Sequence, residues 1–276
     1  MKKSILSIAG SDSIAGAGIQ IDIKVAASLG VHATCAVTAV TAQSTMSVDA
    51  VQTVDPDVVC AQIRAAFSDV PPAAVKVGMI GNGETAEAVA GELALHPKVP
   101  VVLDPVLVAT SGGSLYGDSV LDALIAKMIP SSTIVTPNVP EARALTGIDV
   151  SGPEGMREAA GRIAGFGAGY VLVKGGHGSG SECVDRLYGS EPAAAGDSGP
   201  SGDATSLREL LELRSPRLRG EFHGSGCSLS TAIACGLAQG MPVEDAVTRA
   251  HGLVSRMLAR PTGLGHGSQI VDPFSA

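Results

Sequence analysis

The chain has 276 residues with a formal net charge of −8, and 45% of its residues are apolar. This length and apolar content suffice for one large domain with a sizeable core. Aromatic residues make up only 3% and Lys and Arg do not cluster, which excludes base-stacking platforms and polyanion-binding surfaces, so we expect no nucleic-acid partner.

The first residues are typical of a buried strand. Two lysines follow Met1, but the apolar run after them is short and soon reaches Gly10. No stretch approaches the roughly 18–20 apolar residues that cross a bilayer, so no membrane partner is expected. The five cysteines are odd in number and include no C-x-x-C pair. This pattern predicts reduced thiols in a cytoplasmic protein.

Short apolar runs alternate with helical patterns along the chain. Five runs have the character of buried parallel strands, at 4–9, 74–77, 101–103, 133–135 and 170–173. Helical periodicity occurs at 19–29, 57–67, 84–95, 119–128, 154–166, 227–238 and 243–258. The alternation predicts an α/β fold, a doubly wound and mostly parallel central sheet with helices on both faces. In such sheets ligands bind beyond the carboxyl ends of the strands.

One segment interrupts this order. Residues 191–203 are rich in Pro, Gly, Ser and Ala, and they lie between two expected antiparallel strands near 183–188 and 207–213. The composition predicts a flexible surface insertion within a single domain spanning 1–276.

A glycine-rich loop follows the first strand. It begins at Gly10 and ends at Gly18, where the helix that carries Asp22 starts. Glycines bring backbone close to a ligand, and a helix start offers N–H donors. The loop is neither a Walker A motif nor a clean G-x-G-x-x-G, so an ordinary glycine-rich turn is an equally good interpretation.

Polar residues follow three later strands. Asp104 stands where it can reach Mg²⁺ directly or through water, although a turn or capping Asp is the alternative. Asn138 and Glu141 have the spacing of a capping box, and Glu141 can serve a metal only if it leaves the capping pose. Lys174, beside two glycines, can reach a phosphate as a mobile point charge.

The most specific motif is a loop that leads into an Ala-rich helix. Gly224, Ser225, Gly226 and Cys227 can turn several backbone N–H groups toward one point at the positive end of the helix dipole. Such a nest would hold a transferring phosphoryl group. We expect the thiol pKa of Cys227 to be lowered, so that it can take a proton from an attacking hydroxyl. A small Cys that packs the helix start is the alternative.

Six blocks make the chain recognisable as a whole. They are IAGSDSIAGAGIQIDIKVAASLGVHATCAVTAVTAQST, VKVGMIG, VVLDPVLVATSGGSLYG, IVTPNVPEARALTG, YVLVKGGH and HGSGCSLSTAIA. In this order they resemble the hydroxymethylpyrimidine/phosphomethylpyrimidine kinases of thiamine biosynthesis, within the ribokinase superfamily. The resemblance covers nearly everything except 191–203. It implies a ribokinase-like fold, ATP and Mg²⁺ as cofactors, and a homodimer.

The resemblance also implies roles by position. On the nucleotide side, the metal would be held by Asp104 and Glu141, and ATP would be bound by Lys174, Asn138, Gly224 and Gly226. The 224–227 loop would form the anion hole, with Cys227 as the base. On the substrate side, an aminopyrimidine would meet Gly10, Asp22, Gln43, Met79 and Val106, with Asp22 near its hydroxymethyl group.

Physical chemistry supports the role of Gln43. A carboxamide presents an acceptor beside a donor pair, which complements an aminopyrimidine edge. The implied activity is Mg·ATP-dependent phosphorylation of 4-amino-5-hydroxymethyl-2-methylpyrimidine and then of its monophosphate. A pyridoxal or pyridoxine kinase on the same fold is the alternative enzyme. A non-catalytic sensor of a pyrimidine phosphate is disfavoured, because Asp104, Lys174 and Cys227 are all present.

The chain departs from the family pattern in three places. Ile14 and Ala15 stand where the family usually has more glycine and serine, and Ser225 replaces the commoner Thr. Glu221 and Phe222 precede His223 where the family often has an Asn. These departures affect the first loop and the nucleotide side.

Overall fold

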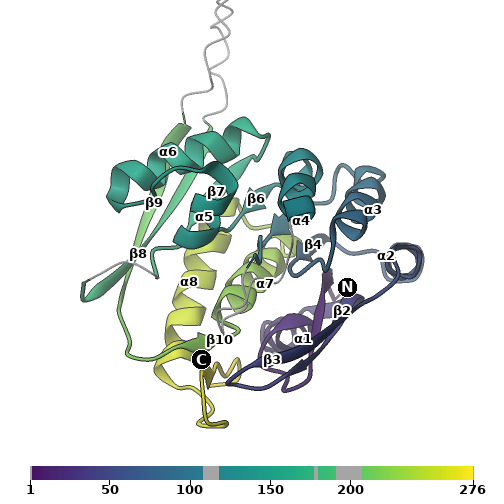
Figure 1. Cartoon of the computed structure of the whole chain (residues 1–276), viewed down its shortest axis with the longest axis horizontal. Coiled ribbons are helices and arrows are strands. Elements are labelled where there is room, and N and C mark those ends of the chain that lie inside the picture. Colours follow the sequence, from purple (N-terminus) through teal and green to yellow (C-terminus); the bar gives the residue numbers. More distant parts are fainter. Residues whose placement is uncertain (1, 108–117, 177–179, 191–206, 276) are drawn as a thin grey trace, which may run out of the picture.

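The computed structural model describes residues 2–107, 118–176, 180–190 and 207–275. Its centre is a nine-stranded sheet with the strand order β3-β2-β1-β4-β5-β6-β7-β8-β9 (Figure 1). The strands are β1 (Ser4–Asp12), β2 (His32–Gln43), β3 (Val48–Thr53), β4 (Ala74–Val77), β5 (Val101–Leu103), β6 (Ile134–Val135), β7 (Tyr170–Val173), β8 (Glu182–Ser190) and β9 (Leu207–Pro216). A separate parallel pair joins β10 (Phe222–His223) to β11 (Gln269–Ile270).

The middle of the sheet is parallel and its margins are antiparallel. Strands β2, β1, β4, β5, β6 and β7 pair in parallel. At one margin β3 pairs antiparallel with β2, and at the other β8 and β9 form an antiparallel hairpin next to β7. The predicted doubly wound, mostly parallel sheet is therefore confirmed.

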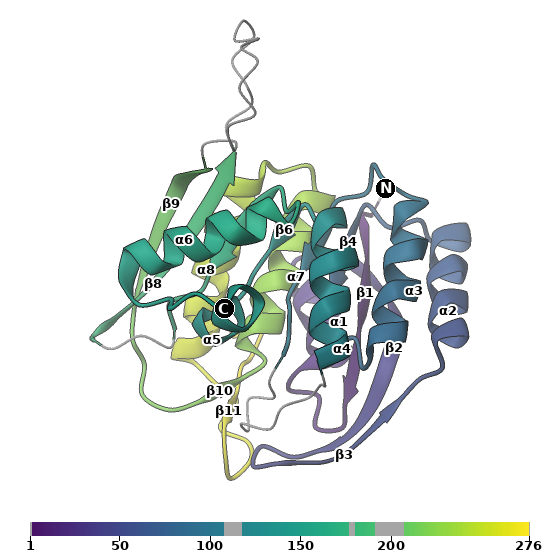
Figure 2. The ribbon, with the colours of Figure 1, turned by 45° about the horizontal axis from the view of Figure 1, so that its top comes forward.

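Helices cover both faces of the sheet (Figure 2). One layer comprises α1 (Gly18–Ser28), α7 (Ser225–Ala238) and α8 (Val243–Ala259). The other comprises α2 (Pro56–Asp69), α3 (Gly83–Ala94), α4 (Asp118–Ala123), α5 (Val139–Thr146) and α6 (Gly152–Gly165). Successive side chains of a strand point to opposite faces of the sheet. On β1, Ile5 packs against the first helix layer and Leu6 packs against the second.

Most predicted elements lie where the pattern placed them. The strands predicted at 74–77, 101–103 and 170–173 coincide with β4, β5 and β7. The strand predicted at 4–9 continues to Asp12, which carries the chain further toward the ligand side of the sheet. The hairpin strands predicted near 183–188 and 207–213 are β8 and β9. The insertion predicted at 191–203 lies outside the described residues.

Several elements differ from the sequence pattern. The helix predicted at 119–128 ends as α4 at Ala123, and a wider π-helical turn follows over Leu124–Met128. Pro130 stands just after this turn, and a proline ring conflicts with the carbonyl four residues before it, which accounts for the widening. The pattern missed β2, β3, β10 and β11. Strand β2 consists mostly of small residues, is only partly buried and lacks a continuous apolar run.

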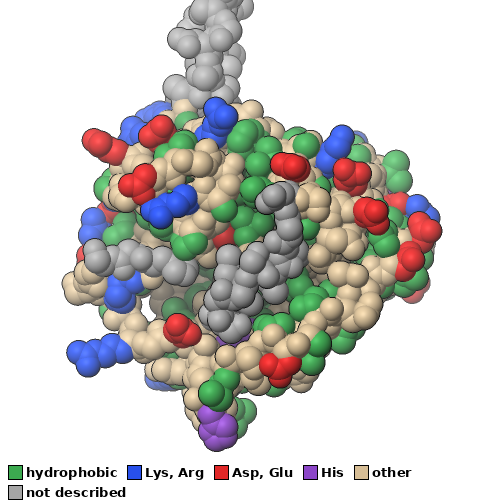
Figure 3. Space-filling model, in the orientation of Figure 1, with side chains coloured by type: hydrophobic (Ala, Val, Ile, Leu, Met, Phe, Trp, Pro, Cys, Tyr) green, Lys and Arg blue, Asp and Glu red, His purple; other side chains and the backbone are tan. Residues whose placement is uncertain are grey.

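The surface seen in Figure 3 mixes charges of both signs. Lys and Arg side chains are interspersed with Asp and Glu side chains across this face. In the part of the chain that the structure describes, no helix combines the length and apolar character needed to cross a bilayer.

Candidate active site

A cavity of about 740 Å³ opens where the strands end and α7 begins. Twelve of the thirteen predicted site residues line it, namely Gly10, Gln43, Met79, Asp104, Val106, Asn138, Glu141, Lys174, Gly224, Ser225, Gly226 and Cys227. They come from seven separated segments of the chain. Because the carboxyl ends of parallel strands meet at one edge of a sheet, the fold gathers these residues into one site.

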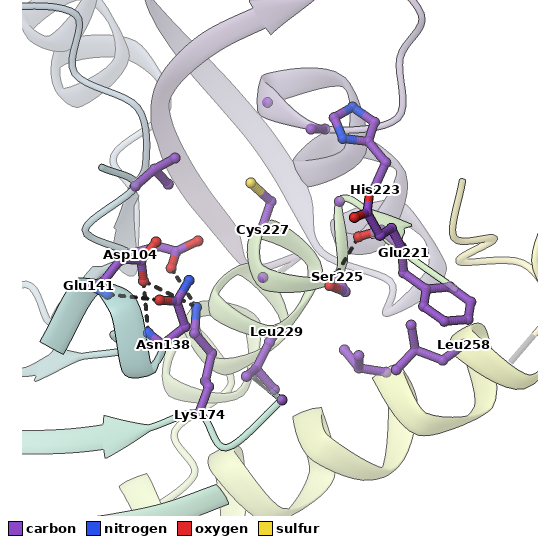
Figure 4. Close-up of a pocket in the computed structure, with 18 of the residues that line it drawn as sticks. Asp104, Asn138, Glu141, Lys174, Glu221, His223, Ser225, Cys227, Leu229 and Leu258 are labelled. Atoms are coloured by element: carbon purple, nitrogen blue, oxygen red, sulfur yellow. Dashed lines mark hydrogen bonds and ion pairs between the residues drawn. The ribbon is translucent and has the colours of Figure 1, made fainter. Parts of the chain in front are cut away.

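A lysine and two buried carboxylates form one side of the cavity (Figure 4). Lys174 Nζ lies 3.0 Å from Asp104 Oδ1 and 4.0 Å from Glu141 Oε2. Asp104 is 1% exposed and Glu141 is 5% exposed. Burial opposes the charge of Lys174, but the two carboxylates outweigh burial and raise the pKa of its amine. Lys174 is therefore a firmly charged cation at the cavity wall.

The capping box predicted at the start of α5 is formed. Asn138 Oδ1 accepts the Glu141 backbone N–H at 2.9 Å, and Glu141 Oε2 accepts the Asn138 backbone N–H at 2.8 Å. Glu141 nevertheless lines the cavity from this pose. The structural and functional interpretations of Glu141 are thus compatible, which differs from the expectation that the side chain must leave the cap.

The two carboxylates carry more negative charge than Lys174 offsets. Burial raises the pKa of Glu141 to about 7; Lys174 opposes this shift and Asp104 adds to it. In the described residues no three His, Cys, Asp or Glu side chains form a metal-binding group. Two oxygen ligands with residual negative charge still fit a hard divalent cation such as Mg²⁺, which binds one or two carboxylates and keeps other oxygen ligands.

The start of α7 reaches the same point as Lys174. Gly224 caps the helix with a φ of 86°, in the left-handed region that favours glycine. A side chain there would overlap the carbonyl of Gly16, so the α7 start packs directly on the first loop. A Cβ atom added to Gly226 would lie 3.3 Å from Lys174 Nζ. The helix N-terminus and the lysine therefore converge on one anion-binding point.

Cys227 lies between the Lys174 cluster and His223 in the view of Figure 4. The backbone N–H of Gly18, the first residue of α1, favours the charged form of the Cys227 thiol. The expected lowering of the thiol pKa is wrong: burial raises the pKa of Cys227 to about 11, with Lys76 opposing the shift and Asp22 adding to it. Removal from water outweighs the helix N-terminus here, so the side chain is a thiol at neutral pH.

Asp22, which was expected near the hydroxymethyl group of the substrate, does not line the cavity. Its side chain is fully buried and forms an ion pair with fully buried Lys76 at 2.8 Å. Its carboxylate also accepts hydrogen bonds from Ser7 at 2.5 Å and Thr231 at 2.7 Å. Its oxygens are thus already engaged behind the cavity wall. Asp22 holds Lys76 in place, and Lys76 is the cation that acts on Cys227.

The opposite end of the cavity is narrow and partly apolar. Gly10 brings the backbone against Met79, because a Cβ atom at Gly10 would lie 3.0 Å from the Met79 sulfur. Val106 and Gln43 complete this end.

The sequence reasoning missed Asp12 and His223 as site residues. Both are buried and line the cavity, and His223 Nε2 lies 2.9 Å from Asp12 Oδ2. Backbone N–H groups of Ile14, Gly16 and Ala17 also donate to Asp12. The sequence could have indicated both residues, because Asp12 lies in the first glycine-rich loop and His223 directly precedes the second. The Ala15 departure lies in this loop, with a φ of 57° where glycine is more usual.

A doubly wound sheet with an Asp, a Lys and a glycine-rich helix start at its strand ends is the architecture of a ribokinase-like phosphotransferase. The Phosphomethylpyrimidine kinase family model matches residues 12–272. The chain belongs to this family.

Individual relatives agree with the family. The hydroxymethylpyrimidine/phosphomethylpyrimidine kinase of Rhizobium meliloti is 42% identical over 268 residues, covering 95% of this chain and 94% of that protein. The thiamine biosynthesis bifunctional protein of Geobacter sulfurreducens is 40% identical over 267 residues, 96% of this chain but 51% of that longer protein. Among solved structures, an ADP complex of Bacillus subtilis pyridoxal kinase has a TM-score of 0.85 at 27% identity, covering 100% of this chain and 98% of that one.

Proposed function

We propose that this chain transfers the γ-phosphoryl group of ATP to the hydroxymethyl oxygen of 4-amino-5-hydroxymethyl-2-methylpyrimidine, and then phosphorylates the monophosphate to the diphosphate. The observation that carries the proposal is that Lys174, the α7 start and Gln43 line the same cavity. Family membership and the name of the Rhizobium relative support the choice of substrate.

The nucleotide occupies the side of the cavity opposite Gln43. Leu229 and Leu258 give that side an apolar surface suited to a nucleobase. Asn138 stands at the β6 end, and its bridge to Lys174 ties these two strand ends together. Lys174 and the backbone N–H groups of 224–227 then face the phosphates. The ADP complex of the pyridoxal kinase neighbour supports a nucleotide here.

Mg²⁺ would be held by Asp104 and Glu141. Bound there, it would neutralise charge on the nucleotide phosphates. The protein itself supplies the fixed cation Lys174 and the helix N-terminus, which stabilise the charge that spreads over the transferring phosphoryl group.

Cys227 takes the proton of the attacking hydroxyl. Its position between Lys174 and His223, which lies beside Gln43, suits that step (Figure 4). With the pKa raised to about 11, the thiol must first lose its own proton, and the nearby ammonium of Lys76 favours the thiolate. Base catalysis by Cys227 therefore becomes more effective as pH rises.

Pyridoxal kinase activity is the second candidate. The TM-score of 0.85 to the Bacillus enzyme favours it, while the higher identity to hydroxymethylpyrimidine kinases favours the first proposal. A sensor without catalysis is disfavoured by the complete set of Asp104, Lys174 and Cys227 in one cavity.

We further propose one cytoplasmic domain over 1–276 that forms a homodimer. All five cysteines are free, which suits a reducing compartment. Three apolar side chains on the sheet margin are exposed: Val40 by 51%, Met46 by 68% and Val51 by 42%. A second copy of the chain would cover them, and analytical ultracentrifugation tests this.

The decisive experiment supplies purified protein with Mg·ATP and the aminopyrimidine alcohol. Mass spectrometry should detect the monophosphate first and the diphosphate later, each with matching ADP release. Monophosphate alone would remove the second step, and ADP release without any phosphorylated pyrimidine would contradict the proposal.

A further inference from the structure

The Gln43 amide is held by the protein at both of its ends. Its backbone is fastened to Ser13, whose hydroxyl accepts the Gln43 N–H at 2.8 Å and donates to its carbonyl at 2.7 Å. One end of the side-chain amide lies 3.2 Å from His223 Nε2, and the other lies 3.2 Å from Thr41 Oγ1. The place of the amide is fixed, and its chemistry depends on which end carries the oxygen.

Asp12 determines the protonation of the His223 nitrogen that faces Gln43. Burial disfavours the charged form of Asp12, but the hydrogen bond with His223 and the backbone N–H donors outweigh burial and lower its pKa. The carboxylate is therefore ionised and only accepts hydrogen bonds. Because His223 Nε2 lies 2.9 Å from it, that nitrogen must carry a proton.

The partners of the amide then decide its orientation. Nε2 of Gln43 beside the protonated His223 nitrogen would set two donors against each other, so the oxygen belongs at that end. Thr41 is compatible with the same result, because its single hydroxyl proton can go to the Ser11 carbonyl at 3.1 Å, which leaves its oxygen to accept from Gln43. A half-turn of the amide removes this contact between two donors and lets the single His223 N–H be shared between Asp12 and the Gln43 oxygen, and hydrogen-bond partners are what assign amide orientation.

We propose that Asp12 and His223 are positioning residues that hold the Gln43 amide with its oxygen toward His223 and its nitrogen toward Thr41. The inference rests on the proposed function and specifies which way round the pyrimidine ring binds to the Gln43 amide. The amino group of the pyrimidine donates to the oxygen on the His223 side. The adjacent ring nitrogen accepts from the amide nitrogen on the Thr41 side. A 4-oxo analogue has the reverse order of donor and acceptor and is rejected.

The test compares kcat/KM for the 4-amino substrate and for 5-hydroxymethyl-2-methylpyrimidin-4-one, in which C4=O replaces the amine and N3 carries a proton. Wild type should favour the amine by about ten- to a hundredfold, since a buried amide left unpaired is costly. His223→Phe should bring this ratio near unity, because the amide can then turn freely. His223→Gln keeps an N–H donor and should restore most of the ratio.

The ratio separates positioning from a merely structural effect. A structural defect lowers kcat/KM for both pyrimidines together and leaves the ratio unchanged. His32→Phe is the matched control. His32 lies at the exposed start of β2, the strand that ends at Gln43, and its replacement should leave both kcat/KM values as in wild type. An unchanged ratio in a folded His223→Phe protein would overturn the inference.

A second measurement needs no variant. In a crystal structure of the wild-type complex, the amino group should face the His223 end of the Gln43 amide, and an amino group at the Thr41 end would overturn the inference. Failure of the proposed function looks different, because wild type would then use neither pyrimidine.

Discussion

Lys174 Nζ lies 3.0 Å from Asp104 Oδ1, and this ion pair joins two strand ends that are 70 residues apart in the sequence. The pair stands against the start of α7, where Gly226 leaves room for it. One cation therefore connects the proposed metal ligand with the anion-binding helix start. We expect each partner in this arrangement to matter for transfer rather than for folding alone.

Lys174→Met should lower kcat by about 10²–10³, the usual cost of removing one donor that stabilises transition-state charge. The measurement is steady-state turnover at saturating ATP and aminopyrimidine. Lys98→Met, at an exposed position, is the control and should retain wild-type turnover. A loss below about tenfold in Lys174→Met would remove the lysine from the transfer step.

Cys227→Ala should retain the fold and ATP affinity but lower kcat by about 10²–10⁴, the usual contribution of a general base. Circular dichroism and nucleotide titration check the first part, and turnover checks the second. Cys60→Ala, on α2, is the matched control, because this buried thiol lies outside the cavity. Nearly normal turnover in Cys227→Ala would mean that the thiol only packs the helix start.

The pH profile of kcat tests the protonation state of Cys227. Because the base acts as a thiolate and burial raises its pKa to about 11, turnover should rise with pH through the range from 7 to 10. Iodoacetamide labelling of this thiol should accelerate over the same range. A plateau of turnover above pH 8 would show that the proton goes elsewhere, and rapid labelling at pH 7 would contradict the raised pKa.

The buried pair of Lys76 and Asp22 should be important for stability. Lys76→Met leaves the Asp22 carboxylate uncompensated, and breaking such a pair costs about 3–5 kcal/mol. Replacing both residues together, as Lys76→Met with Asp22→Leu, should recover part of that loss. Urea unfolding gives the three free energies. If the free energy of unfolding of Lys76→Met lies within about 1 kcal/mol of the wild-type value, the pair contributes little to stability.

Local patterns predicted most of the fold because the middle strands are buried on both faces. The runs at Ala74–Val77 and Tyr170–Val173 are continuous and apolar, so their positions follow from composition. The strand His32–Gln43 alternates small and polar residues beside a sheet margin, and its burial depends on neighbours distant in the sequence. Its pairing could not follow from its own pattern.

The site shows the same division. Glycine-rich loops and strand-end residues such as Asp104 and Lys174 were predictable from their place after strands. The contact of Asp12 with His223 spans 211 residues and depends on how the first loop meets β10. The sequence shows that Cys227 stands at a helix start, which lowers a thiol pKa. It does not show the surrounding residues that bury the thiol and raise its pKa. The burial of Asp22 was hidden for a similar reason, since this residue of α1 pairs with Lys76 on strand β4, 54 residues further along the chain.

We propose that this cavity selects an aminopyrimidine through Gln43. The most direct test measures kcat/KM for 4-amino-5-hydroxymethyl-2-methylpyrimidine and for pyridoxal in wild type and in Gln43→Leu. The account predicts that wild type prefers the aminopyrimidine and that Gln43→Leu loses about ten- to a hundredfold on it, with ATP affinity nearly unchanged. A wild-type preference for pyridoxal would contradict the substrate assignment, and an aminopyrimidine preference that survives Gln43→Leu would contradict the role of Gln43.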